Sequence, residues 1–265
     1  MTAPANRLAC ALAVGGLDPG GGAGIAADLR AFASAGAFGC AAIAVMTVQS
    51  TSGLESSRPV AARDMVAQAS SVVLHQRVRA IKTGALGSAE NVRALAAWLA
   101  LHAGIPVIVD TVMLPTRGRA RLLSPFALGD LRAALIPRAW LVTANAPEAA
   151  ALTGLRVTTV PEARAAALAI KRMGSRAVLV KGGHLEGELA VDVLVTPEGV
   201  TELRARRLAI PPVHGGGCVL ASLIAGRIAV RRERTIDAVR WAKRAHHRLL
   251  ARAVDVGGDL RVLVP

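Results

Sequence analysis

The chain has 265 residues, of which 53% are hydrophobic, and its formal net charge at pH 7 is +14. This length and apolar content are typical of a globular protein with a sizeable core, and they exclude a disordered chain. Gly, Arg and Asp interrupt every apolar run before it reaches the length of a membrane span, so we expect no membrane partner.

The positive charge comes almost entirely from arginine, and Tyr is absent. A nucleic-acid binder usually clusters its basic residues and interleaves them with aromatic side chains. Here the arginines are scattered, and the densest groups, at 204–207 and 227–234, are interpreted as solvated surfaces. We therefore expect no nucleic-acid partner, although the positive field would attract a small anionic substrate.

The N-terminal segment and the cysteines bear on the compartment. The opening MTAPANRLACALAVGG faintly resembles a signal peptide, but it lacks a basic cluster, and we interpret its apolar part as a first buried strand. Cys10, Cys40 and Cys218 are too few and too far apart for a disulfide framework, and no CxxC pair suggests a zinc site. The expected location is the cytoplasm.

Apolar runs of strand length alternate with segments of helical length along the chain. We expect strands at 8–14, 40–48, 78–82, 106–110, 139–144 and 176–182, and helices at 24–35, 62–75 and 89–102. Residues 189–210 differ and predict a β-hairpin that turns at Pro-Glu-Gly, before two helices at 216–229 and 235–253. The alternation predicts a mostly parallel sheet with helices on both faces, formed by one domain over residues 1–265.

Ligands of such sheets bind beyond the carboxyl ends of the strands, where this chain carries five motifs. These are GGLDPGGGAG at 15–24, VDTVM at 109–113, TANAPE at 143–148, VKGGH at 180–184 and HGGGC at 214–218.

The motif HGGGC stands immediately before a predicted helix. The first N–H groups of a helix have no partner within it and carry partial positive charge, so Gly215, Gly216 and Gly217 are suited to cradle a phosphoryl group. Cys218 would lie in the first turn, where the helix dipole is expected to lower the pKa of the thiol and produce a base. The alternative is a flexible glycine connector with a small buried cysteine.

The first glycine cluster is not a dinucleotide fingerprint, because Asp18-Pro19 interrupts the tight turn. Its glycines would let a flat ring lie close to the backbone. Asp28 is as consistent with a stabilising surface charge as with a ligand contact. Gln49 is placed to bond a ring edge, and the segment 49–57 would then form a mobile flap.

Two acids follow neighbouring strands. Asp110 ends one strand and Glu148 lies just inside a helix that Pro147 begins, so the two carboxylates could hold Mg²⁺, although Glu148 also suits a structural role in the first turn. Lys181 ends a buried strand and is interpreted as a phosphate contact. The histidines, His214 and His246 included, lack metal-like spacing and are assigned to loops or the surface.

Together these residues resemble the hydroxymethylpyrimidine and phosphomethylpyrimidine kinases of thiamin synthesis, within the ribokinase-like fold. The resemblance covers about residues 8–255 and is carried by DPGGGAGIAADL, GAFGC, VMTVQSTSG, KTGAL, VDTVML, LLSP, TANAPEAAALTG, VKGGHL and HGGGCVLAS. It implies a three-layer α/β/α sandwich with a small β-hairpin, ATP and Mg²⁺ as cosubstrate and cofactor, and a homodimer.

The resemblance also implies roles for single residues. The residues implied to bind the substrate are Gly16, Asp28, Gln49, Ala85 and Val112. The residues implied to contact the nucleotide are Asn145, Lys181 and Gly183. The residues implied to hold Mg²⁺ are Asp110 and Glu148. The loop of Gly215, Gly216 and Gly217 matches the family's anion hole, and Cys218 matches its base.

The chain departs from the family pattern at several positions. Val213 and Gly216 replace two threonines of the usual THGTGC, Gly20 replaces a serine, and Leu17 stands where Thr or Ser is common. Ala85 stands where a methionine usually covers the ring, which leaves a roomier pocket. We expect ATP-dependent phosphorylation of 4-amino-5-hydroxymethyl-2-methylpyrimidine, of its monophosphate or of both, with pyridoxal or pyridoxine kinase activity or a catalytically weak pyrimidine- or nucleotide-binding relic as the alternatives.

Overall fold

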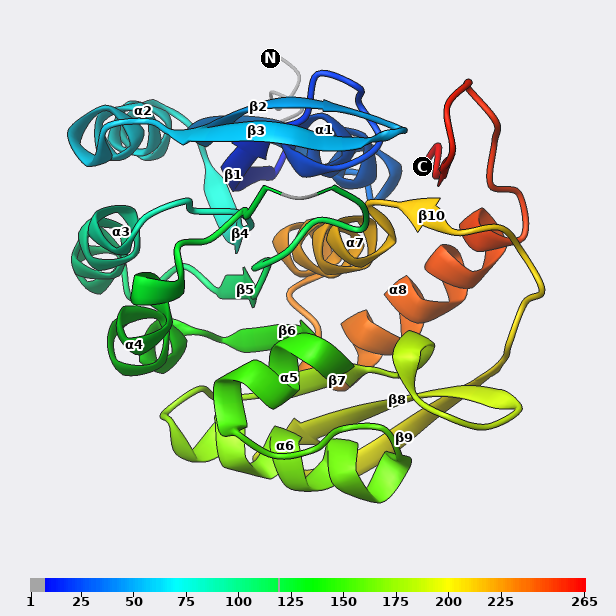
Figure 1. Ribbon diagram of the computed structural model, residues 1–265. Helices are drawn as coiled ribbons and strands as arrows, with labels where there is room; N and C mark the ends of the chain where they lie inside the picture. The colour runs from blue at the N-terminus through cyan, green and yellow to red at the C-terminus, as the bar shows by residue number, and fades with distance from the viewer. Residues whose placement is uncertain (1–7, 119) are drawn as a thin grey trace, which may run out of the picture.

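The computed structural model describes residues 8–118 and 120–265, and residues 1–7 of the opening segment lie outside this range (Figure 1). Its centre is a nine-stranded sheet with the order β3-β2-β1-β4-β5-β6-β7-β8-β9. The strands are β1 (Cys10–Leu17), β2 (Phe38–Ser50), β3 (Gly53–Pro59), β4 (Val78–Thr83), β5 (Val107–Asp110), β6 (Leu141–Asn145), β7 (Val178–Lys181), β8 (Leu189–Thr196) and β9 (Gly199–Arg206).

The six strands from β2 through β1, β4, β5 and β6 to β7 are parallel, as predicted. The predicted hairpin 189–210 forms β8 and β9, which extend the sheet in antiparallel sense from β7. At the other edge, β3 pairs antiparallel with the end of β2. The segment 49–57 was predicted to be a loop. It instead closes a second hairpin, because Val45–Ser50 pairs with Gly53–Pro59, and its role as a mobile flap stays a prediction.

Helices cover both faces of the sheet, which confirms the three-layer sandwich (Figure 1). One face packs against α2 (Ala62–His75), α3 (Ala89–Leu101), α5 (Ala146–Thr153) and α6 (Val160–Arg172). The other face packs against α1 (Gly24–Ser34), α7 (Gly216–Arg231) and α8 (Thr235–Leu250). Because the central strands are covered on both sides, β1 and β5 are buried along nearly their whole length.

Local sequence explains the ends of several helices. Helix α5 begins with a capping box in which the Asn145 side chain accepts from the Glu148 N–H and Glu148 returns a bond to the Asn145 N–H. Helix α6 begins in the same way with Thr159 and Glu162. The α6 segment was not predicted, although Thr-Val-Pro-Glu is a regular signal for a helix start.

The strand order reverses around β1, which has β2 on one side and β4 on the other. In an open parallel sheet this reversal creates a crevice at the carboxyl ends of the strands. The short strands β10 (Val213–His214) and β11 (Arg261–Val262) pair near this crevice and tie the C-terminal segment to the start of α7. Within the described residues, none of the helices is both long and apolar enough for a membrane crossing.

Candidate active site

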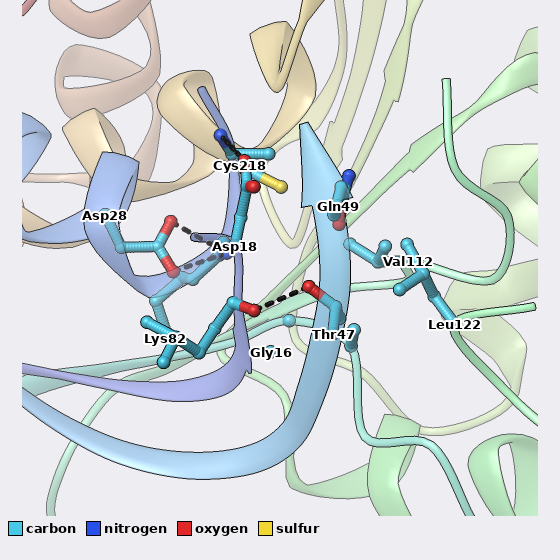
Figure 2. A pocket seen from close by; sticks show the side chains of 14 residues that line it. Gly16, Asp18, Asp28, Thr47, Gln49, Lys82, Val112, Leu122 and Cys218 are labelled. Atoms are coloured by element: carbon cyan, nitrogen blue, oxygen red, sulfur yellow. Dashed lines mark hydrogen bonds and ion pairs between the residues drawn. The ribbon is translucent and has the colours of Figure 1, made fainter. Parts of the chain in front are cut away.

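A pocket opens at the carboxyl ends of β1 and β4 and encloses about 380 Å³, part of it open to solvent (Figure 2). We call it the strand-end pocket. It is lined by Gly16, Leu17, Asp18, Ala23, Gly24, Asp28, Thr47, Gln49, Lys82, Gly84, Ala85, Val112, Leu122 and Cys218. The five residues predicted to bind substrate and the predicted base therefore surround one space, although they come from distant segments of the chain.

The glycine loop reaches this space as the N-terminus of α7. Gly215 is the N-cap with φ 72°, and a Cβ there would collide with the carbonyl oxygen of Gly22, so only glycine fits. The N-cap makes no side-chain hydrogen bond, which leaves the first N–H groups of the helix without a capping acceptor. Gly217 packs against Lys181, so the positive end of the helix and an ammonium group lie side by side.

Cys218 occupies the first turn of α7, as predicted, and its side chain faces the strand-end pocket. The predicted lowering of its pKa was wrong. Burial raises the pKa of the thiol to about 12; the positive charge of Lys82 lowers it, and the carboxylates of Asp110 and Asp28 add to the rise. The thiol is therefore protonated at neutral pH in the free protein.

Asp110, Glu148 and Lys181 form a buried cluster beside the glycine loop. Lys181 Nζ lies 2.9 Å from Asp110 Oδ1 and 3.9 Å from Glu148 Oε2. Burial would lower the pKa of Lys181, but the two carboxylates raise it, so the ammonium is retained. Burial raises the pKa of Glu148 to about 7, with Lys181 acting against the rise and Asp110 adding to it.

The two acids fit a magnesium ion by one specific observation. Asp110 Oδ1 is bonded by Thr143 and Lys181, whereas the buried Asp110 Oδ2 has no hydrogen-bond partner among the described residues. The described residues contain no group of three or more acidic, His or Cys side chains that would hold a metal by themselves. Two carboxylates suit Mg²⁺, because this ion usually takes its other ligands from phosphate oxygens and water.

Asp28 is part of a buried ion pair rather than a surface charge. Both of its oxygens lie 3.0 Å from Lys82 Nζ (Figure 2). Its Oδ1 also accepts from the Ser222 hydroxyl at 2.7 Å. Asp28 and Lys82 side chains are each 1% exposed. Asp28 and Lys82 both line the strand-end pocket, so Asp28 fixes the Lys82 ammonium there, and its contact with the substrate ring stays a prediction.

Two histidines that were assigned to loops or the surface are structural parts of the site. His214 is buried against Gly22 and its Nε2 lies 2.8 Å from Asp18 Oδ2. The His246 Nε2 lies 2.8 Å from the Gly216 carbonyl oxygen, and burial lowers the pKa of this imidazole to about 4. The neutral His246 ring donates its Nε2–H to the carbonyl oxygen of Gly216 in the glycine loop. The spacing of the histidines in the sequence indicated neither this contact nor the one between His214 and Asp18.

The remaining predicted residues lie around the same edge. Asn145 ends β6, and its side-chain oxygen is used in the capping box. Gly183 is exposed in the turn that follows β7, and its carbonyl oxygen accepts a hydrogen bond from the Arg207 guanidinium at 2.7 Å. Arg207 was interpreted as a solvated charge, but it also bonds the Leu185 carbonyl oxygen and so fixes this turn.

The two neighbouring glycines of the loop provide a matched test. A Cβ on Gly217 would lie 2.9 Å from Lys181 Nζ, whereas a Cβ on Gly216 would meet nothing closer than 3.7 Å. The resemblance implies phosphoryl transfer, in which small misplacements of charged groups are costly, so we expect Gly217→Ala to displace the Lys181 ammonium and to reduce kcat by about tenfold or more. Gly216→Ala should lose markedly less. Steady-state kinetics with ATP measures both, and equal losses would contradict the packing argument.

An open parallel sheet with a strand-end pocket, an uncapped helix start and a lysine paired with carboxylates is the arrangement expected of a small-molecule kinase of the α/β class. Comparison with known proteins agrees. The model of the phosphomethylpyrimidine kinase family matches residues 18–262. A hydroxymethylpyrimidine/phosphomethylpyrimidine kinase of Salmonella typhimurium is 41% identical over 216 residues, which cover 81% of each chain. The chain belongs to the phosphomethylpyrimidine kinase family.

Solved structures show the same ribokinase-like fold. A phosphomethylpyrimidine kinase of Clostridium difficile matches with a TM-score of 0.79 and 31% identity, over 91% of this chain and 98% of that one. An ADP complex of Bacillus subtilis pyridoxal kinase matches with a TM-score of 0.88 and 27% identity, over 97% of both chains. The fold is thus shared by kinases that are named for two different rings.

Proposed function

We propose that the chain uses ATP to phosphorylate 4-amino-5-hydroxymethyl-2-methylpyrimidine and its monophosphate in thiamin biosynthesis. The observation that carries this proposal is the convergence of the predicted substrate-binding residues, Cys218 and the uncapped start of α7 on the strand-end pocket. Family membership supplies the substrate class, because the relatives that share about 40% of the sequence carry this activity in their names.

In this proposal one group of residues positions the substrate, and another neutralises the charge of the phosphoryl group. The pyrimidine lies in the strand-end pocket between Gly16, Gln49 and Val112, with its hydroxymethyl group toward Cys218. Lys181 and the N–H groups at the start of α7 neutralise the transferring phosphoryl group. Cys218 can take the proton of the attacking hydroxyl only as a thiolate. Because its pKa is about 12 in the free protein, its own proton must first pass to solvent, and the positive charges of Lys82 and Lys181, which act to lower the pKa of the thiol, favour that loss.

Magnesium would be held by Asp110 and Glu148. Asp110 Oδ2, which accepts no hydrogen bond and lies 4.0 Å from Lys82 Nζ, would supply a ligand oxygen, and the ion would neutralise charge on the ATP phosphates. Its positive charge would also oppose the effect of Asp110 on the Cys218 thiol. The homodimer and the cytoplasmic location stay predictions, which sedimentation equilibrium and cell fractionation test.

The experiment that tests the proposal measures ATP consumption with hydroxymethylpyrimidine, its monophosphate and pyridoxal in parallel. Turnover with the first two ligands supports the proposal. Binding of the pyrimidine without ATP consumption would instead support the relic that binds its ligand without turnover.

Pyridoxal kinase activity is a second candidate because of Ala85. This residue lines the strand-end pocket with a single methyl group, and the pyridoxal kinase of Bacillus subtilis has a closely similar fold. We expect Ala85→Met to narrow the pocket and to reduce kcat/KM for pyridoxal by about tenfold or more, with a smaller effect on the smaller pyrimidine. Competition kinetics with both ligands measures this shift, and equal effects on both rings would show that Ala85 does not select the ring.

A further inference from the structure

The glycine loop at the start of α7 has no side chains of its own to fix its shape. Gly215, Gly216 and Gly217 follow one another directly, and glycine loses more conformational freedom on folding than any other residue. Backbone N–H groups stabilise a transition state only when they already point at the place where charge develops. The loop therefore has to be held by contacts from other parts of the chain.

Helix α8 supplies one of these contacts. The Nε2 of His246 lies 2.8 Å from the carbonyl oxygen of Gly216, which is 30 positions earlier in the chain. Burial lowers the pKa of this imidazole to about 4, and the charges of Lys181 and Lys243 act in the same direction. The bond to Gly216 and the charge of Asp192 oppose this shift. The neutral ring has one N–H, and it is on Nε2, because a carbonyl oxygen can only accept.

Helix α8 is itself fixed on both sides of the phosphate region. Its apolar face is buried in the same core as α7. About one turn before His246, Lys243 Nζ lies 2.7 Å from Asp192 Oδ2, and Asp192 Oδ1 accepts the N–H of Gly182 at 2.7 Å. Gly182 directly follows Lys181. One turn of α8 is thus bonded to the glycine loop and, through Asp192, to the end of the strand that carries the Lys181 ammonium.

The His246 ring lies where a side chain of residue 216 would make its contacts. For a Cβ added to Gly216, the nearest heavy atom would be His246 Nε2, at 3.7 Å, which is an ordinary van der Waals separation. The backbone at Gly216 therefore has room for a side chain and has none. The hydrogen bond from α8 takes the place of the anchoring that such a side chain would give.

We propose that His246 is a positioning residue that holds the carbonyl oxygen of Gly216 and so keeps the N–H groups of the glycine loop aimed at the transferring phosphoryl group. It contacts the loop and does not line the strand-end pocket. This inference rests on the proposed function, because it names a residue on which the same phosphoryl transfer depends.

The first test is a split between kcat and KM. His246→Leu removes the N–H donor, so kcat should fall by about tenfold or more, because the loop is no longer preorganised. KM for the pyrimidine should stay within about twofold of the wild type, because the strand-end pocket is not altered. His246→Gln keeps an N–H donor and should lose less. A kcat of folded His246→Leu equal to that of the wild type would overturn the inference.

His247→Leu is the matched control. His247 is also half-buried in α8, but it is one residue further on and so points about 100° away around the helix. Its kcat should match that of the wild type. Thermal unfolding checks that each variant is folded. If leucine at position 246 prevents folding, His246→Ala, which favours the helix and adds no bulk, is measured in its place with the same expected loss.

The second test is binding without turnover. Calorimetry compares ADP with a non-hydrolysable ATP analogue, which differ in the γ-phosphate that the glycine loop would contact. In His246→Leu the affinity ratio of the analogue to ADP should fall by about threefold or more, with ADP affinity unchanged. A general loss of structure would instead weaken both nucleotides alike. An affinity ratio equal to that of the wild type would contradict the positioning role.

The third test is rescue. Adding Gly216→Ala to His246→Leu restricts the backbone at the position that the ring no longer holds, and the new Cβ fits. The double variant should therefore recover kcat by about two- to fivefold over His246→Leu, which is the usual effect of this change on backbone freedom. A double variant no faster than His246→Leu would show that the ring does not act by limiting loop motion.

The outcomes separate this inference from the function on which it rests. If the wild-type protein transfers phosphate to neither hydroxymethylpyrimidine nor its monophosphate, the proposed function fails. If it transfers phosphate and folded His246→Leu is as fast as His247→Leu, only this inference fails.

Discussion

Replacing Cys218 with alanine is expected to reduce kcat by about 10²- to 10⁴-fold, which is the usual contribution of a general base. The side chain lies in the strand-end pocket at the start of α7, where the attacking hydroxyl must approach the phosphoryl group. ATP affinity should change little, because in the proposed mechanism the phosphate contacts come from backbone N–H groups and Lys181. Single-turnover kinetics and ATP titration measure the two quantities separately.

Cys10→Ala is the matched control for this variant. Cys10 is also a reduced cysteine, but it is buried at the beginning of β1 and does not line the strand-end pocket. It should retain turnover close to that of the wild type. Undiminished turnover in Cys218→Ala would remove the thiol from the mechanism.

The second large effect concerns stability. Lys82→Met removes the only cation within 4 Å of the buried Asp28 among the described residues, so the free energy of unfolding should fall by about 3–5 kcal/mol. Burial would lower the pKa of Lys82, but Asp28, followed by Cys218 and Asp110, raises it, which agrees with a retained ammonium. Turnover should fall as well, because Lys82 is the leading charge that lowers the pKa of Cys218. Urea unfolding measures the loss.

Two further variants separate the ion pair from simple packing. In Lys82→Met/Asp28→Leu no buried charge is left without its partner, so most of the lost stability should return. Arg93→Met removes one partner of an exposed pair with Asp130 and should cost no more than about 1 kcal/mol. If the double variant were as unstable as Lys82→Met, uncompensated charge would not be the cause.

The sequence predicted the parts of the fold that depend on local pattern. The alternation of apolar runs with helical segments, the length of those runs and the helix-start signals located the parallel strands, the hairpin 189–210 and the helix that carries Cys218. The prediction that Asp110 and Lys181 end buried strands was correct. A charged residue that follows a buried apolar run usually marks the point where the strand leaves the core. Strand β3 was missed because GLESSRP is polar, and it forms only by pairing with β2 at the edge of the sheet.

The rest of the site depends on burial and on contacts between distant segments. The contact between His214 and Asp18 joins residues 196 positions apart, and no local pattern indicates it. The pKa of Cys218 rises because of burial, which the position of a residue in a first helical turn does not reveal. For the same reason the pairing of Asp28 with Lys82, across 54 positions, could not be separated from a surface charge.

A crystal structure with hydroxymethylpyrimidine and a non-hydrolysable ATP analogue tests the central claim most directly. We predict that the pyrimidine occupies the strand-end pocket with its hydroxymethyl oxygen within hydrogen-bond reach of Cys218 Sγ. The γ-phosphate should lie against the N–H groups of residues 216–218 and beside Lys181. A pyrimidine bound elsewhere, or a γ-phosphate remote from the start of α7, would contradict the account.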